Sequence, residues 1–136
     1  MTINKPILAQ ADSSLPGLNY AVELQKLAAS VGFDWPNIEG VIDKIHEEID
    51  EVNAETNTPD NHARLLDEMG DLLFACTNLA RHLNIDPEMA LAAGNEKFYR
   101  RFSQLEQLAK TQEKKIEHLS LEALDLLWER VKHDEK

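Results

Sequence analysis

One stretch decides the fold, Glu68-Met69-Gly70-Asp71-Leu72-Leu73-Phe74-Ala75-Cys76, in which two carboxylates run directly into a strongly apolar segment. The apolar side chains around it recur every three or four residues, the period of an α-helix. They form the main face of a helix expected from about Asp60 to Leu83 and comprise Leu65, Leu66, Met69, Leu72, Leu73, Cys76, Leu79 and Ala80. Phe74 projects from the opposite side, so this helix needs apolar partners on two sides. We therefore expect a helical bundle completed by self-association.

Four further helices have recognisable start and stop signals. A helix over 18–31 should end at Gly32 in a left-handed C-cap, and a second should run over 36–56 after Asp34 and Pro36. Asp86-Pro87 opens a helix over 87–112, and Ser120 caps the last one, over 121–133. The expected fold class is all-α, with one domain over residues 17–136 that follows a flexible leader at 1–16.

Composition narrows the class of protein. Only 6% of the 136 residues are aromatic, and glycine and proline are few, which favours helices over a β-sandwich or barrel. The formal net charge of −11 argues against a nucleic-acid partner, which would require a basic face. No segment resembles a signal peptide or a membrane span, and a single cysteine cannot form an intrachain disulfide. We expect a soluble, cytoplasmic protein without a membrane partner.

A second acidic cluster, Glu47-Glu48-Ile49-Asp50-Glu51, lies in the expected second helix. Helical stepping places Glu48 and Glu51 at the margin of its apolar stripe, as Glu68 and Asp71 flank the stripe of the third helix. A short connection makes the two helices antiparallel, so these flanks can meet. Crowded carboxylates beside apolar surface need a cation, and oxygen ligands suit a hard divalent ion such as Mg²⁺.

The acidic clusters also admit a simpler interpretation, as plain surface. Glutamates at this spacing often form only a solvated helix face, and Lys44 could simply form a surface ion pair with Glu48. A di-iron or di-manganese bundle is disfavoured because neither cluster contains the Glu-x-x-His pattern that such sites require.

A basic segment, Asn95–Phe102, stands out in this acidic chain. Lys97 and Arg101 are four residues apart and share a helix face, so both can reach one anion. Trp128 and Lys132 repeat that spacing, and an aromatic ring beside a lysine can stack on a base while the amine holds a phosphate. The alternatives are ion pairs with nearby glutamates for the arginine and core packing for the tryptophan.

Lys44-x-x-Glu47-Glu48-x-x-Glu51, followed after sixteen residues by Glu68-x-x-Asp71, resembles the EExxE…ExxD signature of the MazG nucleoside triphosphate pyrophosphohydrolases. Val31–Trp35, Asn78–Leu83 and Asn95–Phe102 extend the resemblance, which runs from about Leu15 onward. The chain is most similar to the C-terminal, catalytic repeat of these proteins. Proteins of this type commonly carry two such repeats, and one is present here.

The resemblance implies an all-α fold in which two chains form a dimer around a four-helix core. It also implies Mg²⁺-dependent hydrolysis of a nucleoside triphosphate to the monophosphate and pyrophosphate, with Mn²⁺ as a possible substitute. The magnesium ligands it implies are Glu48, Glu51, Glu68 and Asp71. Glu47 completes the catalytic motif, by orienting a ligand or activating water. The implied substrate contacts are Lys44, Lys97, Arg101, Trp128 and Lys132.

Two alternatives in function accompany this prediction. The chain could be a helical dimerisation or regulatory module that performs no chemistry. It could also be a narrower enzyme, such as a dUTP or dCTP pyrophosphatase or a phosphoribosyl-ATP pyrophosphohydrolase, because the same motif serves all of these.

Overall fold

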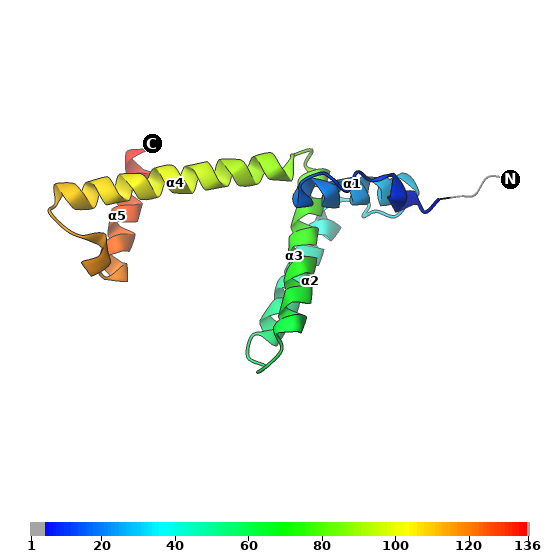
Figure 1. Ribbon diagram of the computed structural model, residues 1–136, viewed down its shortest axis with the longest axis horizontal. Coiled ribbons are helices and arrows are strands. Elements are labelled where there is room, and N and C mark those ends of the chain that lie inside the picture. The colour runs from blue at the N-terminus through cyan, green and yellow to red at the C-terminus, as the bar shows by residue number, and fades with distance from the viewer. Residues whose placement is uncertain (1–4, 136) are drawn as a thin grey trace. The chain divides into compact units, whose positions relative to one another are not determined.

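The computed structural model describes residues 5–135, and every regular element within them is helical, as expected (Figure 1). The elements are η1 (Ile7–Gln10), α1 (Gly17–Ser30), α2 (Ile38–Glu55), α3 (His62–His82), α4 (Pro87–Thr111), η2 (Ile116–His118) and α5 (Leu121–Asp134). The described residues form two compact units, one up to Ala90 and one from Leu91 onward. Within residues 5–135, no helix is both long and apolar enough to span a bilayer.

Local capping signals set most helix ends. Gly32 has φ +91°, the left-handed conformation expected after α1. The Asp86 carboxylate accepts hydrogen bonds from the N–H groups of Glu88 and Met89, and Ser120 Oγ accepts one from Ala123 at 3.1 Å. These ends agree with the sequence-based prediction.

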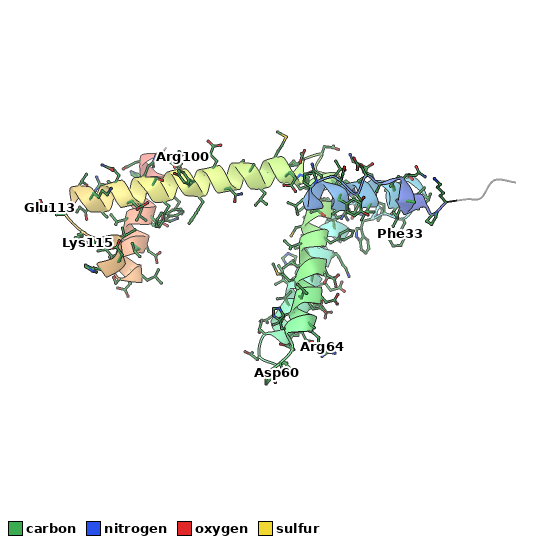
Figure 2. The ribbon with its side chains drawn as sticks, in the orientation of Figure 1. Phe33, Asp60, Arg64, Arg100, Glu113 and Lys115 are labelled. Carbon is green, nitrogen blue, oxygen red and sulfur yellow. The ribbon has the colours of Figure 1, made fainter. Side chains whose placement is uncertain are left out.

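Two helices begin later than expected. Asn37, rather than Asp34, caps α2, because its side chain accepts a hydrogen bond from the Gly40 N–H at 3.2 Å. Asp60 has φ +57° in the turn before α3 (labelled in Figure 2), so that helix begins only at His62. In the expected leader, residues 1–4 lie outside the described residues, and Ile7–Gln10 forms the short 3-10 helix η1.

The first unit is built on the α2–α3 hairpin. A short turn joins the two helices, which lie side by side and run antiparallel (Figure 1). The Gln25 side chain of α1 donates hydrogen bonds to Thr77 Oγ1 and the Phe74 carbonyl of α3, each at 3.0 Å. The Glu88 carboxylate accepts from the Leu18 N–H at 3.2 Å and so caps the start of α1. These polar contacts fix α1 against the hairpin and the first turn of α4.

An apolar seam on the hairpin faces solvent. It contains five side chains, each between 39% and 68% exposed: Ile42 and Ile49 of α2, and Leu66, Met69 and Leu73 of α3. Their spacings of three, four and seven residues place them along one face of each helix. Phe74, on another side of α3, is also exposed. The exposed seam agrees with the expectation that α3 needs partners on two sides, and the dimer itself stays a prediction.

The second unit has its own small apolar core. Leu105 and Ala109 of α4 pack with Leu127 and Val131 of α5, and each of these side chains is buried. The chain reverses after α4 at Glu113, which has φ +57°, and reaches η2 through Lys115 (both labelled in Figure 2). The two buried residues of each helix are four positions apart, so they lie on one face of their helix and can pack against the other helix.

Candidate metal and phosphate site

The α2–α3 hairpin brings three carboxylates together. Glu48 of α2 and Glu68 and Asp71 of α3 each offer one oxygen, and these oxygens all lie within 4.8 Å of one another. Glu48 precedes the connecting turn by about two helical turns, and Glu68 follows it by about the same distance, so the antiparallel helices present them at one level. The predicted meeting of the two acidic flanks is therefore present for these three residues.

The buried member of this group has a single cationic neighbour among the described residues. Glu48 is only 6% exposed, and Lys44 Nζ lies 3.0 Å from its Oε1 atom. The same ammonium lies 3.3 Å from Oε1 of Glu47, which is largely exposed. Hydrogen bonds to Glu48 and then Glu47 raise the pKa of Lys44, so it stays charged. The ion pair suggested by the Lys44–Glu48 spacing thus exists, and it offsets part of the cost of burying the carboxylate.

The surroundings of the cluster change the pKa of Glu68. Its pKa is raised by partial burial and then by the negative charges of Glu51, Asp71, Asp67 and Glu48. Glu51, the fourth predicted ligand, is exposed and does not belong to the close group of three. Its charge nevertheless acts on Glu68, so it lies beside the cluster.

This donor set fits a hard divalent cation. It offers several carboxylate oxygens, and one of the carboxylates is buried. Burial and then charge repulsion raise the pKa of Glu68, and a bound positive charge would relieve that repulsion. A site for zinc would more commonly use histidine or cysteine, and this group contains neither.

Three of the predicted phosphate-binding residues, Lys97, Arg101 and Lys132, belong to the second unit. Arg101 forms an ion pair with Glu135, with 2.9 Å between Nη2 and Oε2, and Lys132 pairs with Glu129 at 3.2 Å. Lys97 lies on the exposed surface of α4. The hydrogen bond from Arg101, and then its positive charge, lower the pKa of Glu135. The alternative considered for Arg101, an ion pair with a glutamate, is therefore present.

Trp128 also lies in the second unit, where it packs against the apolar core. Its ring centroid is 5.7 Å from that of Phe98, which in turn stacks on Phe102 at 5.9 Å. Core packing, the alternative considered for Trp128, is therefore present, and its contact with a nucleotide stays a prediction.

One polar cluster was not anticipated from the sequence. The Asp34 carboxylate accepts hydrogen bonds from both Nη atoms of Arg81, and His82 Nε2 lies 3.0 Å from its Oδ1 atom. Chiefly because of the Arg81 hydrogen bonds, the pKa of Asp34 falls to about 2. Asp34 looked like a helix-start residue, and no local signal links it to side chains 47 positions away.

Comparison with known proteins supplies independent findings. The family model described as phosphoribosyl-ATP pyrophosphohydrolase matches residues 26–98. The chain is 46% identical over 123 residues to the nucleoside triphosphate pyrophosphohydrolase of Escherichia coli (strain K12), covering 90% of this chain and 47% of that protein. It is 41% identical over 125 residues to the nucleoside triphosphate pyrophosphohydrolase/pyrophosphatase MazG of Thermotoga maritima, covering 92% and 48%. An uncharacterized protein of Bacillus subtilis (strain 168), YabN, is 43% identical over 81 residues, covering 60% and 16%.

The chain spans about half the length of the first two relatives. Together with the family match, their similarity confirms the resemblance predicted from the acidic motif.

Proposed function

The chain belongs to the phosphoribosyl-ATP pyrophosphohydrolase family, and from this premise we propose that it hydrolyses nucleoside triphosphates to nucleoside monophosphate and pyrophosphate with Mg²⁺. The observation that carries the proposal is the convergence of Glu48, Glu68 and Asp71 within 4.8 Å. The names of the E. coli and T. maritima relatives support the choice of reaction.

Glu48, Glu68 and Asp71 would hold the Mg²⁺ ion, or Mn²⁺ in its place, and Glu51 would complete the set from the adjacent surface. The bound ion would supply positive charge to the phosphate oxygens and Lewis acidity for the attack of water. Glu47 would orient this attacking water, or accept a proton from it, since its carboxylate is largely exposed.

Basic residues would bind the triphosphate. Lys44 already lies against Glu47 and Glu48 and can turn its ammonium toward a phosphate that reaches the carboxylates. Lys97, Arg101 and Lys132 would neutralise charge on the departing pyrophosphate, and Trp128 would contact the nucleotide beside them. For Arg101 this requires exchange of the Glu135 carboxylate for a phosphate, which the guanidinium can bind through two parallel hydrogen bonds in the same way.

A homodimer is part of the proposal. The apolar seam of the α2–α3 hairpin can pack against its own copy and so form a four-helix core. Light scattering should give the mass of two chains, and Leu73→Lys, which places a charge in the seam, should shift the protein toward one chain. Leu126→Lys alters an exposed leucine outside the seam and should leave the mass unchanged. The cytoplasmic location predicted from the sequence stays part of this proposal.

A product assay tests the reaction. Purified protein with ATP and Mg²⁺ should release AMP and pyrophosphate, as separated by ion-exchange chromatography, and EDTA should stop the release. Glu68→Gln should abolish turnover while retaining the helical circular dichroism signal. Asp50→Asn removes the same charge from an exposed site on α2 and should retain full activity. Release of ADP and phosphate, or wild-type turnover by Glu68→Gln, would contradict the proposal.

Assays on the same purified protein distinguish this function from two others. The description of the matching family favours phosphoribosyl-ATP as a second substrate candidate, so it belongs in the panel beside ATP, dCTP and dUTP. A non-catalytic helical module would turn over none of them, and Mg²⁺ would leave its melting temperature unchanged.

A further inference from the structure

The loop between α1 and α2 holds an aromatic side chain in a defined place while leaving it open to solvent. Trp35 is 44% exposed, and its neighbour Phe33 (labelled in Figure 2) is 80% exposed. The Trp35 N–H donates to the Asp34 carboxylate at 2.8 Å. Arg81, from the last turn of α3, holds that carboxylate with two hydrogen bonds. The backbone of Trp35 is thereby tied to the hairpin that carries the acidic group.

The Trp35 ring packs against α2 at Gly40, where there is no side chain in its way. A Cβ atom added to Gly40 would lie 3.3 Å from Cε3 and 3.6 Å from Cδ2 of the indole. Glycine is a poor helix former, and α2 nevertheless has one in its first turn. The indole therefore lies where the side chain of residue 40 would project, and this fixes its direction from the helix axis.

The face of α2 that begins at this indole leads to the carboxylates. With about 100° per residue, Lys44 and Glu51 project within about 40° of Gly40, and Glu48 within about 80°. With a rise of about 1.5 Å per residue, Lys44 lies ~6 Å and Glu48 ~12 Å from Gly40 along the helix axis. An aromatic ring, an ammonium group and a carboxylate cluster that could hold a metal ion thus follow one another along one side of α2 within the first unit.

We propose that Trp35 is the platform on which the base of the nucleotide stacks, an inference that rests on the proposed function. The order of ring, ammonium and carboxylates along α2 is the order of base, sugar-phosphate and metal-bound phosphates in such a substrate. Stacking on an indole uses the face of the base and not its hydrogen-bonding edge, so it tolerates any base. Trp35 therefore contributes affinity for nucleosides in general and little choice among them.

Steady-state kinetics test this assignment. Trp35→Ala should raise KM for ATP about tenfold or more while kcat changes little, because stacking is equal in the ground state and the transition state. Trp35→Phe should recover most of that loss. Phe33→Ala removes an exposed ring from the same loop and should leave KM unchanged. Inorganic tripolyphosphate, which has no base, should inhibit the wild type and Trp35→Ala with the same inhibition constant.

A binding measurement separates this inference from the hydrolysis itself. A non-hydrolysable ATP analogue should quench the tryptophan emission of the wild type by an amount that Trp35→Phe loses, whereas tripolyphosphate should not. Equal quenching in Trp35→Phe, or none in the wild type, overturns the assignment. So does a parallel rise of the tripolyphosphate inhibition constant in Trp35→Ala, which would mean a general structural defect. A smaller mass for Trp35→Ala by light scattering also overturns it, since the ring would then pack against a second copy. Absence of turnover by the wild type would contradict the proposed hydrolysis, whereas the quenching measurement tests the stacking on Trp35 independently.

Discussion

Replacing Asp34 by asparagine should weaken the fold in a way that depends on pH. The Asp34 carboxylate joins the α1–α2 loop to the end of α3 through Arg81, whose side chain is only 12% exposed. The asparagine variant keeps the size of the side chain but loses the negative charge that two guanidinium nitrogens face. It also leaves a largely buried cation without its counter-ion, so the loss should be measurable as a lower free energy of unfolding.

The size of this loss follows from the pKa of Asp34. Its fall from 3.8 to about 2 corresponds to about 2 to 3 kcal/mol at neutral pH, at about 1.4 kcal/mol per pKa unit. The side chain of Asp34 is 27% exposed and the residue as a whole more so, and solvent screening reduces this to about 1 kcal/mol. Because the folded pKa lies below the unfolded one, the contribution is complete above pH 3.8 or so. It disappears as the pH falls through about 2, and about half of it should be gone at pH 3.

Urea unfolding of the wild type and Asp34→Asn at pH 7, 5 and 3 measures this difference. The two curves should be separated by about 1 kcal/mol at pH 7 and by about half as much at pH 3. Asp43→Asn, an exposed aspartate on α2, is the matched control and should differ little from the wild type at each pH. A difference between Asp34→Asn and the wild type that stays constant from pH 7 to pH 3 would refute the charge-based explanation, and so would no difference at pH 7.

Three further predictions concern the second unit. Leu105→Ala empties a site that is 2% exposed and should lower the free energy of unfolding by about 2 to 4 kcal/mol in urea titration; a loss below 1 kcal/mol would mean a loosely packed core. Ser120→Ala removes the cap of α5 and should cost about 1 kcal/mol in the same assay, unlike the exposed Ser103→Ala. Glu135→Gln removes the carboxylate that holds Arg101 and should lower KM for ATP about two- to fivefold; a higher KM would mean that Glu135 positions the arginine for the phosphate.

Helices and their ends were largely predictable because their signals are local. Gly32, Asp86 and Ser120 act on groups within a few residues of themselves, so their roles could be recognised without knowing the fold. α2 begins two residues after the expected position because the Asn37 side chain caps it. The Asp34 carboxylate instead binds Arg81 on another helix.

The acidic group could be predicted from the sequence only in part. Helical periodicity and one short turn sufficed to predict that Glu48, Glu68 and Asp71 approach one another. The same reasoning included Glu51, which does not belong to the close group of three. Helical periodicity gives the direction in which a side chain projects, but it does not give the distance between side-chain oxygens to within a few ångströms.

The amino-acid pattern by itself determined which segments are helical, where they end, and that two acidic flanks share one hairpin. Those properties depend on interactions spanning fewer than about ten residues and on a single turn. Only the tertiary structure decided that Asp34 binds Arg81, that Gln25 joins α1 to α3, and that Glu135 holds Arg101. Each of these pairs connects residues more than thirty positions apart, and their choice of partner depends on which surfaces packing brings into contact.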